Sequence, residues 1–286
     1  LHSHFLGFSP TSDYTPATTN DDETVGGYAR IATFINNLKK DTDRPVFYFD
    51  GGDFSMGTPF HLGVMETGFE LNILKAIGMD ATTLGNHEFD FRPGGLAKMV
   101  NSALLRGDIP IITSANLAFS STSADDDSLK KLFNEKVIKN YSVIEKQGVK
   151  IGFYGITGKD ALKVAPNKTP VTYIETNEIA QKIVDHLRQV EKVDLVVQLS
   201  HSGLWDNKSI SEDEITAKQV NGIDVIVSGH TRDKKIKPLM INDTLIVHAG
   251  MYGQYVGVLD LEVDDGKVTL LNYSLNTIDD KILGDS

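Results

Sequence analysis

The sequence predicts an α/β fold, in detail a four-layer α/β/β/α sandwich of two mixed β-sheets flanked by helices. Apolar strands alternate with amphipathic helices along most of the chain, as expected for strands that are buried beneath helices. From residue 244 onward the strands follow each other after short turns, which favours antiparallel pairing. No linker divides the 286 residues, so we expect one domain over residues 1–286.

The first half of the chain supplies both kinds of element. Apolar residues at steps of three and four mark its helices. Its strands are short apolar runs that end in polar or glycine-rich turns. The expected elements are a helix over 31–38, a strand over 45–50, a helix over 64–77, a strand over 81–84, a helix over 95–105, a strand over 109–117 and a surface loop over 118–130.

The second half contains the longest apolar runs. Continuous apolar strands without alternation are typical of a sheet that is covered on both faces. The expected elements are a strand over 149–156, a helix over 179–190, strands over 194–200 and 223–229, and the closing strands over 244–250, 254–263 and 267–275.

The composition excludes several functional classes. A net charge of −11 and a pI near 5.1 argue against a general affinity for nucleic acid or anionic membranes. The chain has no cysteine, hence no disulfide and no thiolate metal site, which fits an exported protein without demonstrating export. No apolar run approaches the ~18 residues of a membrane span. Because the chain starts at Leu1 rather than Met, we expect that a segment upstream was removed.

Polar side chains follow the C-terminal ends of four predicted strands. Asp53 follows the strand over 45–50, and Asn86 and His87 follow the next strand within the run TTLGNHEFDF. His201 and His230 come directly after the two long apolar strands of the second half. Sites in α/β sheets are built at this edge, so we expect these groups to converge.

The kinds of side chain indicate a metal site. One carboxylate, one carboxamide and several imidazoles suit Zn, Mn, Fe, Co or Ni better than Ca, and leave the identity of the metal open. Asp53 has two carboxylate oxygens and could bridge two cations. Two cations ~3.5–4 Å apart can clamp both oxygens of an in-line displacement, which suits the hydrolysis of a phosphate ester.

Four motifs in this order, GGDFSMGTP, TLGNHEFD, LSHSG and SGHT, resemble the calcineurin-like metallophosphoesterases. The segments ANL and LIVHAGMYGQYVG resemble the branch of 5′-nucleotidases and UDP-sugar hydrolases. The resemblance implies a hydrolase of phosphate esters, above all nucleotides, with two divalent cations and a small-molecule substrate. It also implies an extracytoplasmic location and a separate C-terminal domain for substrate specificity, which we expect to lie outside this chain. The oligomeric state stays open.

The resemblance also implies roles for single residues. His87 would face the phosphate and the leaving group, and Asp90 would orient its ring. The implied metal ligands are His2 at a first position, Asn86, His201 and His230 at a second position, and Asp53 as the bridge between them.

Two departures from the family pattern bear on the first metal position. The Asp that opens the family's DxH motif would stand one residue before Leu1, where a further strand is also expected. The second His of the GHxH motif is Arg232, which has no lone pair to offer a metal but can bind a substrate phosphate. The first metal would then be weakly held, exchangeable, or completed by another residue or by water. Asn116 could contact the substrate or hold a turn.

Two alternatives to a nucleotidase follow. Arg232 and the missing Asp would fit a metal-weakened relative that binds a phosphorylated ligand without efficient turnover. The same chemistry could also act on cyclic-phosphate or sulfur esters. The side chains of His61, His248, Trp205 and Tyr252 could line the pocket or serve packing alone.

Overall fold

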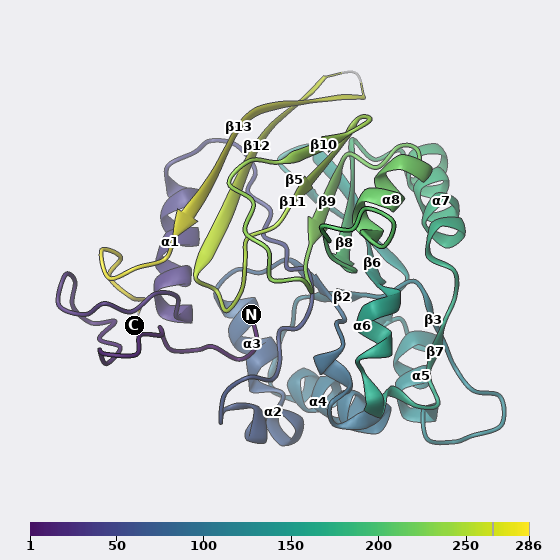
Figure 1. The fold of residues 1–286 in the computed structure, drawn as a ribbon, viewed down its shortest axis with the longest axis horizontal. Helices are drawn as coiled ribbons and strands as arrows, with labels where there is room; N and C mark the ends of the chain where they lie inside the picture. The colour runs from purple at the N-terminus through teal and green to yellow at the C-terminus, as the bar shows by residue number, and fades with distance from the viewer. Residues whose placement is uncertain (265, 286) are drawn as a thin grey trace.

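The computed structural model describes residues 1–264 and 266–285, and a six-stranded mixed sheet is its largest element (Figure 1). The strand order is β10-β11-β9-β8-β6-β5. The four inner strands are parallel, and β5 and β10 pair antiparallel at the two edges. The strands are β5 (Tyr141–Lys146), β6 (Val149–Thr157), β8 (Leu195–His201), β9 (Val225–Ser228), β10 (Leu239–Ile241) and β11 (Thr244–Val247).

Smaller sheets accompany it. A parallel three-stranded sheet has the order β1-β2-β4, and two antiparallel pairs join β12 to β13 and β3 to β7. The predicted strand over 45–50 makes a single bridge, between Phe49 and Ala81, and is otherwise an extended segment. The strands are β1 (Ala81–Thr83), β2 (Ile111–Thr113), β3 (Leu117–Ala118), β4 (Ile138–Lys139), β7 (Thr172–Tyr173), β12 (Tyr255–Asp264) and β13 (Lys267–Thr277).

Helices surround the sheets. In Figure 1, α7 and α8 lie at one side of the six-stranded sheet, α1 lies beside β12 and β13, and α2 to α5 gather at the lower end. The helices are α1 (Tyr28–Lys40), α2 (His61–Thr67), α3 (Phe69–Ala76), α4 (Arg92–Arg106), α5 (Asp127–Asn134), α6 (Lys159–Lys163), α7 (Thr176–His186) and α8 (Glu212–Gln219), with short 3-10 turns at His87–Phe89 and Pro166–Lys168 and a π-type turn at Leu187–Glu191.

The core lies on both faces of the six-stranded sheet. Val196 packs in the apolar cluster beneath α7 and α8, whereas the next residue, Val197, packs in the cluster on the opposite face. This alternation is the two-residue period of a strand. Every residue of β8 is buried, so the polar side chain that ends this strand, His201, starts from a rigid frame.

The predicted α/β class is confirmed, and several details differ from the prediction besides the segment over 45–50. The helix expected over 64–77 is two helices, because Gly68 adopts φ +63° and ends α2. The loop expected over 118–130 already turns into α5 at Asp127. The closing strands are antiparallel in β12 and β13, but β11 pairs parallel with β9. The four-layer order stays a prediction.

None of the helices in the described residues is both long and apolar enough to cross a membrane. This agrees with the absence of a long apolar run in the sequence.

Candidate metal centre

The predicted site residues converge where the strands end. His201 is the last residue of β8, His230 follows β9 by two residues, and Asn86 and His87 follow β1. Of these, Asn86, His87 and His230 border a cavity of about 700 Å³. Its lining includes Asp53, Asn86, His87, Asp160, Leu204, Trp205, His230 and Arg232.

Asp53 occupies the centre of the site. Its Oδ2 lies 3.0 Å from His201 Nε2 and 3.4 Å from His2 Nε2, and its Oδ1 accepts a 2.9 Å hydrogen bond from the backbone N–H of His87. Burial works against ionisation, but the imidazoles of His201 and His2 hold the pKa of Asp53 well below its usual range. The carboxylate is therefore charged and faces ring nitrogens on two sides.

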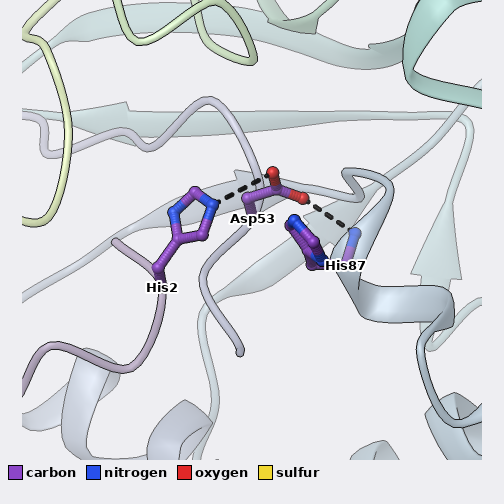
Figure 2. A group of neighbouring side chains, drawn as sticks. All are labelled: His2, Asp53 and His87. Atoms are coloured by element: carbon purple, nitrogen blue, oxygen red, sulfur yellow. Dashed lines mark hydrogen bonds and ion pairs between the residues drawn. The ribbon is translucent and has the colours of Figure 1, made fainter. Parts of the chain in front are cut away.

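Two groups of donor atoms share this carboxylate. His2, Asp53 and His87 form one group, which we call the first cluster, and Asp53, His201 and His230 form the second cluster. Within each cluster the donor atoms lie within 4.8 Å of one another. Figure 2 shows the rings of His2 and His87 flanking the Asp53 carboxylate. An arrangement of two clusters with one shared carboxylate is what a bridging ligand requires.

His201 is held in the tautomer that a metal ligand needs. Its Nδ1–H donates a 2.7 Å hydrogen bond to the carbonyl oxygen of Gly51, which leaves the lone pair on Nε2 in the neutral ring. That nitrogen lies 3.0 Å from Asp53 Oδ2 and 3.2 Å from Asn86 Oδ1. Burial lowers the pKa of His201, but the Asp53 carboxylate outweighs it and raises the pKa overall. A cation bound here would displace that proton.

His230 is oriented from a different direction. Its Nε2 is 3.0 Å from Asp160 Oδ2. A carboxylate only accepts hydrogen bonds, so Nε2 carries the proton and Nδ1 carries the lone pair of the neutral ring. Burial lowers the pKa of His230, which favours that neutral ring.

His2 is the least supported of these imidazoles. It is 6% exposed, and within the described residues neither of its ring nitrogens makes a hydrogen bond. Burial lowers its pKa to about 4, so it is neutral at pH 7 and has a lone pair to offer. Its Nε2 contacts Asp53 Oδ2 only at 3.4 Å. A buried polar ring without a hydrogen bond is costly, and a cation would supply a stronger partner.

The backbone is strained at several of these positions. Positive φ angles at non-glycine residues cluster at functional sites. Five such residues surround this site: His2 (φ 58°), Asp53 (φ 52°), His230 (φ 70°), Arg232 (φ 58°) and Tyr252 (φ 59°). Space is also tight, since a Cβ on Gly85 would lie 2.2 Å from Asp53 Oδ1. The loops are thus shaped to bring the donors close together.

Glu88 fastens the loop that carries Asp53. Its carboxylate accepts hydrogen bonds from the backbone N–H groups of Asp53 (3.1 Å), Ser55 (3.1 Å) and Gly85 (2.6 Å), and from the Ser55 hydroxyl (3.0 Å). Burial raises the pKa of Glu88 to about 7. Glu88 therefore holds the strained backbone of Asp53 against the turn that carries Asn86.

Asp213 plays the corresponding part on the other side, and the sequence analysis missed it. From α8 it accepts 2.5 Å hydrogen bonds from the hydroxyls of Ser200 and Ser228, each next to or near a site histidine. Burial raises its pKa to about 6. In the sequence it is one of three consecutive acidic residues in the first turn of a helix, which does not separate it from ordinary surface acids.

His87 and Asp90 form the predicted pair. His87 Nδ1 lies 3.0 Å from Asp90 Oδ2, which leaves Nε2 as the free ring nitrogen. Because this ring also belongs to the first cluster, its geometry allows either a metal ligand or a proton donor to a bound substrate. The assignment of His87 to catalysis stays a prediction.

Asn116 and Arg232 differ in their access to the cavity. Asn116 is fully buried, and its amide group donates to the carbonyl oxygen of Thr157 (2.8 Å) and accepts from its N–H (3.1 Å). These contacts favour the second of its two roles, that of holding a turn. Arg232 is exposed, lines the cavity and lies over the ring of Tyr252, with its Cζ 5.4 Å from the ring centroid. A guanidinium in this place can meet an anionic substrate.

The donor set fits divalent cations. It combines an ionised carboxylate, a carboxamide and imidazoles whose donor atoms lie within 4.8 Å of one another in each cluster. The family model described as calcineurin-like phosphoesterase matches residues 1–232. The chain belongs to the calcineurin-like phosphoesterase family. Membership in this family implies divalent metal ions at the site.

Similar proteins indicate the branch of the family to which the chain belongs. A 5′-nucleotidase of Vibrio cholerae is 28% identical over 277 residues, which cover 87% of this chain and 47% of the relative. The crystal structure of a 5′-nucleotidase precursor from Thermus thermophilus has a TM-score of 0.78 and 25% identity, with 99% of this chain and 54% of the other covered. The predicted 5′-nucleotidase branch is thereby confirmed. The chain spans about half the length of these relatives.

A sulfate thiohydrolase from Thermus thermophilus shares the fold at a TM-score of 0.71 and 20% identity, covering 90% of this chain and 43% of the other. A likeness at this level of identity concerns the fold alone.

Proposed function

We propose that this chain is the metallophosphoesterase domain of an enzyme that hydrolyses phosphate esters, and that its substrates are nucleotides. One observation carries the proposal: the two donor clusters share the carboxylate of Asp53 at the border of a cavity large enough for a small molecule. The names of the relatives support the choice of nucleotides.

Two divalent cations would be held by the clusters. His2 would serve the first position, and Asn86, His201 and His230 the second, with Asp53 between them. When bound, the cations supply an activated water and positive charge for the phosphoryl oxygens. The residues of the chain fix the positions of these charges, and burial favours the neutral rings of His2 and His230.

The other side chains would act on the substrate. Arg232 faces the cavity with a permanent positive charge and would bind a phosphate oxygen that the cations do not reach. His87 would donate a proton, or a strong hydrogen bond, from Nε2 to the leaving oxygen, while Asp90 holds Nδ1. Negative charge that develops on the leaving oxygen is thereby neutralised.

One observation favours a second candidate. Arg232 stands where the family's sequence pattern has a ligand of the first metal, and His2 lacks any hydrogen bond within the described residues. If the first position stays empty, the chain would bind a phosphorylated ligand with slow or no turnover.

The extracytoplasmic location also stays a prediction.

Phosphate release from nucleoside monophosphates, diphosphates, cyclic nucleotides and p-nitrophenyl phosphate tests the proposal. The chain is stripped with a chelator and then titrated with Mn²⁺, Zn²⁺ or Co²⁺, with a His201→Ala, His230→Ala double variant as the control. We expect activity that requires the added cation, that favours nucleotides, and that the double variant lacks. Ligand binding without release of phosphate would support the second candidate. Activity that the chelator leaves intact would overturn both.

A further inference from the structure

To serve as a metal ligand with one ring nitrogen, each of His201 and His230 needs a hydrogen-bond acceptor for the other nitrogen. The two rings have acceptors of different kinds. For His201 the partner is the backbone oxygen of Gly51. For His230 it is the side chain of Asp160, which stands in the first turn of α6 and belongs to none of the family motifs in the sequence. Because a side-chain partner can be removed by substitution, its effect can be measured directly.

We propose that Asp160 is a positioning residue that accepts the Nε2–H of His230 and thereby presents the Nδ1 lone pair to the cation of the second cluster. The proposal rests on the metal site of the proposed function. The 3.0 Å contact between Asp160 Oδ2 and His230 Nε2 carries it, because a carboxylate can bind only the protonated nitrogen. The other ring nitrogen is then the only one with a lone pair.

The position of Asp160 is fixed by its own surroundings. The N–H of Gly158 donates a 3.0 Å hydrogen bond to the carbonyl oxygen of His201, which ties the start of α6 to the end of β8. A Cβ on Gly158 would lie 2.6 Å from the Cα of Ser202, so this close approach requires glycine. The Glu212 carboxylate accepts the N–H groups of Lys159 (2.9 Å) and Asp160 (3.3 Å).

Asp160 is therefore attached to the same strand that ends in His201. Its carboxylate and the second cluster form one rigid unit, even though the side chain of Asp160 is 41% exposed. Partial exposure also means that Asp160 is not part of the core, so its loss leaves the fold intact. Carboxylate partners of ligating histidines fix the tautomer and raise the basicity of the ligand, and their loss costs about 10–100-fold in metal affinity.

The test compares Asp160→Ala and Asp160→Asn with the matched control Asp206→Ala, which removes an exposed carboxylate from the lining of the same cavity. Affinities for Zn²⁺ and Mn²⁺ are measured by competition with a chromogenic chelator. We expect Asp160→Ala to weaken one of the two cation positions by about 10–100-fold. Asp160→Asn should fall in between, because its carbonyl oxygen can still accept, and Asp206→Ala should match the wild type.

A structural readout separates positioning from a general loss of stability. In the Zn²⁺-loaded wild type, ¹⁵N NMR of the histidine rings should show a protonated Nε2 and a metal-bound Nδ1 at His230. Unchanged affinity in Asp160→Ala, or a metal-bound Nε2 at His230, would overturn the proposal. A wild type that binds no cation would overturn it together with the metal-dependent function. A wild type that binds cations as described but hydrolyses no ester would overturn the proposed function alone.

Discussion

The two donor clusters share Asp53 but differ in how firmly the other ligands are held. In the second cluster His201 and His230 each have one nitrogen bound by a fixed acceptor. In the first cluster neither nitrogen of His2 makes a hydrogen bond within the described residues, and Nε2 contacts Asp53 only at 3.4 Å. A ligand that is already oriented loses less freedom when it binds a metal. We therefore expect that, of the two proposed metal positions, the second fills first.

The supporting carboxylates show the same contrast. Asp213 on α8 binds the serines at the ends of β8 and β9, and Asp160 on α6 binds the ring of His230. The loop of His2 depends on Glu70, which accepts hydrogen bonds from the hydroxyls of Ser3 (2.6 Å) and Tyr28 (2.9 Å). Burial raises the pKa of Glu70 to about 8, so this partner is largely uncharged at pH 7. No carboxylate of this kind reaches the ring of His2 apart from Asp53 itself within the described residues.

The largest expected effect concerns His87, which lies in the first cluster and which we predict to act in catalysis. His87→Asn should lower kcat by roughly 10²–10⁴-fold, the usual cost of losing a general acid. Asp90→Asn should cost less, since the ring stays in place without its partner. The loss should be greater for a nucleoside monophosphate than for p-nitrophenyl phosphate, whose leaving group needs little protonation.

Metal content is the control for this variant. If His87 is a proton donor, the His87→Asn variant keeps the wild-type content of bound cations. Loss of cations in parallel with activity would mean that His87 is a ligand of the first cluster. The contrast between the clusters would then shrink, because the first cluster would hold two imidazoles as the second does.

A direct comparison of ligands should give the next largest effect. His201→Ala should lower the affinity of the tighter cation position by more than about 10–100-fold, the loss expected when only a hydrogen-bond partner of a ligand is removed. His2→Ala should affect the weaker position and leave the tighter one near its wild-type affinity. Stepwise titration with Zn²⁺, followed by elemental analysis after gel filtration, separates the two. Equal losses in both variants would show that the clusters fill together.

The sequence predicts the centre of the site well because its donors stand at strand ends. Asp53, Asn86, His201 and His230 each follow an apolar run, and apolar periodicity is the part of a fold that a sequence shows most directly. His201 and His230 converge because β8 and β9 are neighbours in one sheet, whereas Asn86 follows β1 of the three-stranded sheet, and the meeting of the two sheets is a matter of tertiary packing. For the same reason the strands around β6, β8 and β9 are predicted nearly to their ends.

The supporting residues could not be predicted in this way. Asp160 and Asp213 lie on helices far from the motifs, and tertiary packing alone brings them to His230 and to the serines of β8 and β9. Asn116 shows the converse case. It follows a predicted strand as the site residues do, but its amide group is fully hydrogen-bonded to the backbone of Thr157. Gly68 divides one predicted helix because its left-handed backbone conformation ends α2. The apolar periodicity continues across this position and does not reveal the break.

The smallest expected effect concerns Arg232. Arg232→His would replace a cation at the border of the cavity with a neutral ring that has a lone pair. We expect tighter binding at the weaker cation position by on the order of tenfold, the equivalent of about 1.4 kcal/mol. Arg232→Ala removes the charge without adding a ligand and serves as the matched control. If both variants gain equally, the repulsion by the guanidinium limits the first position. If only the His variant gains, a missing ligand limits it. If neither variant binds the cation more tightly than the wild type, Arg232 neither repels the cation nor occupies the place of a ligand. Its contact with the ring of Tyr252 would then account for its position.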